Sequence, residues 1–249
     1  MTGIALVALA AAGGMAAGII TCLAGVGGGI VLIVLLSSVL PAPDVVALTA
    51  PVFLIGNLDR AWLFRGDVDR SIAPWFAVGA VPAATMGSVV LGDLPASMVQ
   101  TGIAVVVLTF VTLRLLPRGR NWRVAVPMPA FIAVGALNGG VSAVAGGGGL
   151  MTAPFLHAHG LSRGSFVGTD SLFGVIINLI KTLVYLVSGL LVTGDLWISA
   201  SAALAMAGGN RVGRRLLRTI SPRVFERLLL AVLTVAGIRL LVNAVSAGP

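Results

Sequence analysis

The sequence predicts an all-α integral membrane protein, and three observations carry this prediction. Hydrophobic residues fill 58% of the 249 positions, only 10% are charged, and the mean hydropathy is +1.08. A soluble domain has roughly 25% charged residues. Apolar runs of about 20 residues, the length that a bilayer-spanning helix needs, recur along the whole chain. The net charge of +8 therefore indicates basic loops on one side of a bilayer and no nucleic-acid partner.

Ten apolar segments are predicted, and two of them are too short to cross a bilayer. The short segments, 30–40 and 150–159, reach about half of the hydrocarbon core. Each follows a glycine cluster, at 25–29 or 146–149. The full-length segments lie at 2–24, 44–64, 71–91, 95–117, 124–145, 164–189, 195–213 and 222–245. Two helices that glycine interrupts at corresponding positions indicate a transporter built from an internal repeat.

A spacing of 120 positions relates the two halves of the chain. This spacing pairs Gly27, Gly28 and Gly29 with Gly147, Gly148 and Gly149, and it also pairs Thr49 with Thr169 and Phe53 with Phe173. We therefore predict a first repeat at 1–118, a basic cytoplasmic linker at 119–123 and a second repeat at 124–249. In each repeat a glycine-broken helix pair, one full and one half helix, precedes three transmembrane helices.

The distribution of basic residues predicts the orientation. All 16 Lys and Arg residues except Lys181 and Arg239 lie at 60–70, 114–123, 163 or 211–227, whereas the turns at 41–44, 92–94 and 190–195 contain Asp and no basic residue. Short loops rich in Arg stay in the cytoplasm. All basic turns lie on the cytoplasmic side only if each pair of helices interrupted by glycine enters and leaves the membrane on the same side. The two repeats are therefore predicted to be inverted, with both termini outside.

Inversion brings the two glycine hairpins into the membrane from opposite sides, so we expect both tips to reach the same central region. Each half helix begins at its tip, where free backbone N–H groups and the positive end of the helix dipole favour an anion. The glycines at 27–29 and 147–149 are thus candidates for a substrate site. The alternative interpretation is close helix packing at glycine with no ligand.

The segment 164–189 carries a polar stripe. Asp170 and Lys181 share one helix face, and Asn178 lies beside it. An ionised residue at a helix centre costs about 2.5–3.5 kcal/mol on insertion scales, so such residues usually face the interior of a bundle. In one interpretation Lys181 attracts the anion, and Asp170 braces the backbone or carries a proton. In the other, Lys181 snorkels to the outer interface and Asp170 caps a broken helix.

Four further polar residues are candidates for a role at the site or in its support. Thr49 and Thr169 donate their hydroxyls either to an anion or to their own helix backbone four residues earlier. Arg60 is expected near the cytoplasmic surface in a structural role. Asn138 precedes the second glycine cluster and is a candidate to brace it.

Segments 24–30, 145–154 and 167–173, together with Lys181, resemble the TauE/SafE family of sulfite exporters. The resemblance covers both halves, and it adds Ser171 to the candidate substrate-binding residues because Ser171 lies within the matching segment. It implies that the chain moves a sulfur-containing anion, such as sulfite or an organosulfonate, out of a bacterial cytoplasm. The expected location is the inner membrane, and the expected partners are this anion and the lipid bilayer.

Other function classes fit the sequence less well or stay open. A membrane-embedded enzyme is disfavoured because no nucleophile–base pair is evident, and one Cys with two His leaves no metal-ligand cluster. We therefore expect no catalytic residues, no cofactor and no metal site. A small-solute channel with the same inverted hairpins and an importer of a sulfur anion such as thiosulfate remain alternatives. A homodimer also stays open.

Overall fold

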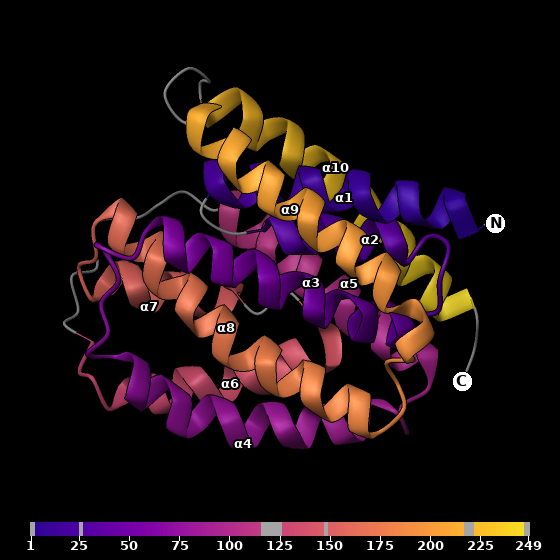
Figure 1. Cartoon of the computed structure of the whole chain (residues 1–249), viewed down its shortest axis with the longest axis horizontal. Coiled ribbons are helices and arrows are strands. Elements are labelled where there is room, and N and C mark those ends of the chain that lie inside the picture. Colours follow the sequence, from indigo (N-terminus) through magenta and orange to yellow (C-terminus); the bar gives the residue numbers. More distant parts are fainter. Residues whose placement is uncertain (1–2, 25–26, 116–125, 147–148, 217–221, 247–249) are drawn as a thin grey trace.

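A computed structural model describes residues 3–24, 27–115, 126–146, 149–216 and 222–246 (Figure 1). The described residues form ten α-helices and one short 3-10 helix. In chain order these are α1 (Gly3–Ala24), α2 (Gly28–Leu36), α3 (Ala42–Leu63), α4 (Ala73–Leu91), α5 (Ala96–Leu115), α6 (Ala130–Ala145), α7 (Gly149–Ala158), α8 (Arg163–Val187), η1 (Thr193–Asp195), α9 (Leu196–Leu216) and α10 (Pro222–Ser246).

The all-helical membrane fold predicted from the sequence is confirmed. Five helices in the described part of the chain are long and apolar enough to cross a membrane: α1, α3, α4, α5 and α8. The two short segments are also found, as α2 with 9 residues and α7 with 10. The main difference is α6, which begins at Ala130 and not at residue 124, because Pro129 stands directly before it as the N-cap residue. The predicted linker at 119–123 lies outside the described residues.

Glycines cap the helix ends where the two hairpins turn. Gly27, the N-cap of α2, has a φ of 97°, and Gly146, the C-cap of α6, has a φ of 68°. These left-handed conformations are accessible to glycine without the steric cost that a Cβ imposes. The first turn of α2 therefore starts beside the C-terminal part of α1, and α2 runs back along it.

Two helix pairs, α1 with α9 and α4 with α6, make the most extensive contacts in the described chain. Both pairs approach closely because glycines face the partner backbone. A Cβ on Gly14 would overlap the carbonyl oxygen of Ala202, and a Cβ on Gly79 would overlap that of Ile132. Gly18, Gly209 and Gly213 in the first pair and Gly135 and Gly139 in the second make similar approaches. Small residues drive association inside a bilayer in this way, because apolar burial adds little there.

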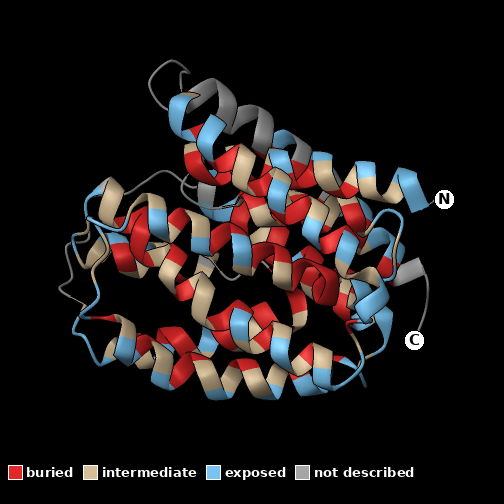
Figure 2. Cartoon of the chain, in the orientation of Figure 1, coloured by how far each residue is buried: buried red, intermediate tan, exposed pale blue. Residues whose placement is uncertain are grey.

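Helices α3 and α8 run antiparallel through the centre of the molecule and hold half of the buried polar residues of the described chain. Figure 2 shows buried residues gathered where the helices meet and exposed ones on the outer faces. Helix α9 is parallel to α1 and α3, and α4 is parallel to α6 and α8, as the contacts between them show. The first helices of the two hairpins, α1 and α6, therefore run in opposite directions. The start of α1 and the end of α10 lie at one end of the molecule (Figure 1).

Candidate functional site

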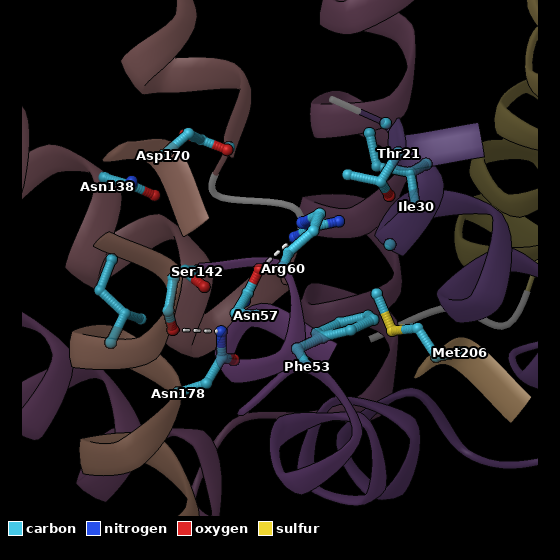
Figure 3. Close-up of a pocket in the computed structure, with 15 residues that line it drawn as sticks. Thr21, Ile30, Phe53, Asn57, Arg60, Asn138, Ser142, Asp170, Asn178 and Met206 are labelled. Atoms are coloured by element: carbon cyan, nitrogen blue, oxygen red, sulfur yellow. Dashed lines mark hydrogen bonds between the residues drawn. The ribbon is translucent and has the colours of Figure 1, made fainter. Parts of the chain in front are cut away.

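A cavity of about 90 Å³ lies between the two hairpin tips and the central helices α3 and α8 (Figure 3). One water needs roughly 10–15 Å³ of such space, so the cavity has room for a small anion. Gly27, Gly29 and Ile30 line it from the first hairpin, and Gly149 lines it from the second. The expectation that both tips reach one region therefore agrees with the geometry.

Arg60 of α3 brings a buried positive charge to this cavity. Its side chain is only 4% exposed and lines the cavity wall. The guanidinium is held by two neighbours: Nε donates to Ser171 Oγ at 2.9 Å, and Nη2 donates to Asn57 Oδ1. Its third nitrogen, Nη1, is buried and has no hydrogen-bond partner among the described residues. The sequence had placed Arg60 near the cytoplasmic surface, so its position in the cavity is a correction.

Asp170 of α8 lines the cavity and faces the start of α7. Thr152, in the first turn of α7, donates its hydroxyl to Asp170 Oδ1 at 2.5 Å. A carboxylate beside a helix N-terminus is favoured by the helix dipole. The Thr152 hydroxyl thus links the Asp170 carboxylate to the first turn of α7.

Two asparagines add polar groups to the cavity wall. Asn178 of α8 donates Nδ2 to the carbonyl of Gly174 at 2.7 Å, while its Oδ1 is buried without a partner. Asn138 of α6 is 3% exposed, and its Oδ1 likewise has no partner in the described chain. Figure 3 shows Asn138, Asp170 and Asn178 on one side of the Arg60 guanidinium, with Phe53 and Met206 on the other.

Lys181 does not line the cavity and instead supports the broken end of α6. Its Nζ donates to the carbonyl oxygen of Ser142 at 2.7 Å, and Tyr185 on the same face donates its hydroxyl to the carbonyl of Ala143 at 2.5 Å. These carbonyls belong to the last turn of α6, where the helix dipole is negative. Lys181 is 0% exposed, so snorkelling to the interface does not occur.

Several residues predicted for the site do not line the cavity. Gly28 faces α1, where a Cβ would overlap Thr21 Oγ1. Thr49 donates to the carbonyl of its own helix at Val45, 2.8 Å away, which is the second of its two interpretations. Ser171 donates its hydroxyl to the carbonyl of Val167 at 2.7 Å, and the same oxygen accepts the hydrogen bond from Arg60 Nε. Ser171 therefore positions the Arg60 guanidinium. Gly147 and Gly148 lie outside the described residues.

Thr169 anchors the loop that joins α3 to α4. Its hydroxyl accepts the backbone N–H of Asp69 at 2.9 Å. The Asp69 carboxylate in turn receives the hydroxyl of Ser71 at 2.6 Å and its N–H at 2.9 Å, and these bonds hold the pKa of Asp69 below its usual value. His159 Nε2 lies 3.9 Å from the same carboxylate. Thr169 thus holds a loop at the end of α8 and does not line the cavity.

The sequence interpretation missed four residues that shape the site. Arg60, Asn57 and Ser142 line the cavity, and Thr152 holds Asp170. One signal pointed to Arg60: it lies in an apolar segment, and an ionised residue there usually faces the bundle interior. Its closeness to the basic turn at 60–70 outweighed that signal.

A comparison with protein families identifies the chain. The family model for the sulfite exporter TauE/SafE matches residues 10–240, which include both hairpins and every helix around the cavity. The chain belongs to the sulfite exporter TauE/SafE family. The resemblance found in the sequence is thereby confirmed, and since TauE/SafE proteins are transporters, the cavity is a candidate transport site. Searches of curated proteins and of solved structures gave no match.

Proposed function

We propose that this TauE/SafE protein exports a sulfur-containing anion of the sulfite or organosulfonate class across the bacterial inner membrane, and that the cavity between the hairpin tips binds it. The single observation that carries the proposal is the free Nη1 of Arg60. A buried donor without a partner costs free energy, and more so when it is charged. An anion in the cavity removes that cost by accepting from Nη1.

The two hairpin tips contribute to binding unequally. Helix α2 begins at the cavity with no acidic residue in its first turn and no side-chain cap. The first turn of α7 already has Asp170 beside it. Position 50, which the repeat pairs with Asp170, is Ala. The positive end of the α2 dipole therefore remains for the substrate, next to the Arg60 guanidinium.

The scaffold of the proposed transporter is a pair of inverted repeats. Helices α1 and α6 run in opposite directions, and the α1–α9 contact has its counterpart in the contact of α6 with α4. Both relations are expected when α1 to α5 and α6 to α10 are two copies related by a twofold axis in the membrane plane. The basic residues then face the cytoplasm, and both termini lie outside.

Export of a monoanion needs no coupling ion in this scheme. An inside-negative potential of 100 mV favours exit by about 2.3 kcal/mol per charge. An importer would have to work against the same gradient. The potential thus gives export its direction, while the cavity selects the anion.

Flux in liposomes tests the proposed function. Purified protein is reconstituted and supplied with sulfite, sulfate, thiosulfate, sulfoacetate or taurine. We expect saturable flux and counterflow with at least one of the sulfur oxyanions, because a carrier binds its substrate on both sides. Flux without saturation or counterflow would indicate a channel, and no flux with any of the five would contradict the proposal.

Cysteine labelling tests the proposed orientation. In a Cys22→Ala background, Asp93→Cys and Val192→Cys are expected to react with an impermeant thiol reagent applied to intact cells, and Asp67→Cys is expected not to react. All three positions are exposed in turns, so accessibility to the reagent depends on the side of the membrane. Labelling of Asp67→Cys from outside would reverse the orientation.

A further inference from the structure

The cavity presents hydrogen-bond acceptors that nothing in the described chain satisfies. Asn178 is the clearest case because its orientation is defined by chemistry: Nδ2 donates to the Gly174 carbonyl at 2.7 Å, so Oδ1 must be the other atom of the amide. That oxygen is buried and unpartnered, in a side chain 5% exposed. Asn138 Oδ1 is in the same condition, in a side chain 3% exposed.

Several donors that line or adjoin the cavity are already bonded within the protein. Thr152 gives its hydroxyl to Asp170, and the Arg60 donors Nε and Nη2 bond to Ser171 and Asn57. Nη1 of Arg60, which has no partner among the described residues, suits the oxygens of an anion. Buried polar atoms are nearly always hydrogen-bonded in native proteins, so unpaired acceptors facing a cavity call for a donor from whatever fills it.

We propose that the anion carried by this site bears a hydrogen-bond donor of its own, an O–H or N–H group, in addition to its sulfur-bound oxygens. The anion's oxygens accept hydrogen bonds from Arg60 Nη1 and from the backbone at the start of α2. Its own O–H or N–H group donates to Asn138 Oδ1 and Asn178 Oδ1. Hydrogensulfite and small amino- or hydroxy-bearing sulfonates have this chemistry. The sulfite dianion, sulfate and simple alkanesulfonates lack it. This inference rests on the proposed function, because it specifies the substrate of the same cavity.

Two anions of matched shape isolate the donor. Sulfamate and methanesulfonate share the SO₃⁻ head, the charge and nearly the same volume, and they differ only by NH₂ in place of CH₃. A site built to hydrogen-bond a substrate group rejects the analogue that lacks it, because its own polar atoms then stay unpaired. We expect sulfamate to bind the detergent-purified full chain at least tenfold more tightly than methanesulfonate, measured by isothermal titration calorimetry.

Variants connect the preference to the two asparagines. Asn138→Leu and Asn178→Leu remove the acceptors at similar volume, so the preference for sulfamate is expected to fall below threefold in each. Asn243→Leu changes an exposed asparagine of α10 and serves as the control that keeps the full preference. If a cavity variant does not fold, the ratio measured on the unmodified protein decides the question alone.

The outcomes separate this inference from the proposed function. Tighter sulfamate binding that both asparagine variants reduce supports it. Equal binding of the two anions, or tighter methanesulfonate binding, overturns the inference and leaves an anion transporter standing. Failure of both anions and of sulfite to bind overturns the proposed function and this inference together.

Discussion

Replacing Arg60 with Gln is expected to weaken binding of the transported anion at least a hundredfold, about 2.7 kcal/mol. Arg60 brings a buried cation with a free donor to the cavity, and truncating one partner of a buried charge pair typically costs about 2–5 kcal/mol. Calorimetric titration of the full chain with the best substrate from the liposome panel measures the effect. Arg60→Lys keeps the charge but not the planar fork held by Asn57 and Ser171, so an intermediate loss is expected.

A nearby arginine supplies the matched control. Arg65 lies in the turn just after α3, five residues beyond Arg60, and its exposed side chain lies over the Trp62 ring. Arg65→Gln makes the identical chemical change outside the cavity and is expected to leave affinity within twofold. Equal losses in the two variants would mean that general surface charge attracts the anion, and the cavity would no longer explain binding.

Lys181→Met distinguishes a direct from an indirect cation. Lys181 is equally buried but bonds to the carbonyl of Ser142 and does not line the cavity. Its loss is expected to lower the thermal stability of the protein and to weaken anion affinity much less than Arg60→Gln does. If the two variants lost affinity to the same degree, Lys181 would act as the anion attractor that the sequence interpretation also allowed.

Replacing Gly28 with Leu is expected to abolish transport while the protein still reaches the membrane. A Cβ at this position would overlap the carbonyl oxygen of Ala17 and the hydroxyl of Thr21, so α2 must move away from α1. Overpacking of this kind typically costs about 1–3 kcal/mol, and here it displaces Gly27 and Gly29 from the cavity wall. Membrane fractionation and liposome flux measure the two parts of the effect.

Gly140→Leu is the control for this substitution. Gly140 lies in α6, the first helix of the other hairpin, and a Cβ there would meet no other element of the described chain within 4 Å. The same side chain should therefore be tolerated, with flux close to that of the unmodified protein. Normal flux in Gly28→Leu would show that the position of α2 does not matter, and the role assigned to its N-terminus would be wrong.

Local sequence patterns were sufficient to predict the helices and both hairpins. The length of an apolar run and the position of a glycine act within a single segment, so α1 to α5 and α7 to α10 lie close to their predicted ranges. Even the asparagine at 178 was found, because a polar residue on an apolar helix usually faces the bundle interior. The start of α6 was missed because the apolar pattern outweighed the proline at 129.

Choosing between equivalent polar residues required the three-dimensional packing. Arg60 and Lys181 lie equally far along α3 and α8, which the predicted repeat pairs, and composition does not distinguish them. The contact of α8 with the end of α6 gives Lys181 a backbone carbonyl. Among the described residues, Arg60 bonds only to side chains, and its Nη1 has no partner. Helix formation depends on residues that are close in the sequence, so local patterns predict it. The partner of a buried charge depends on which distant backbone groups reach it, and only the assembled helices decide that.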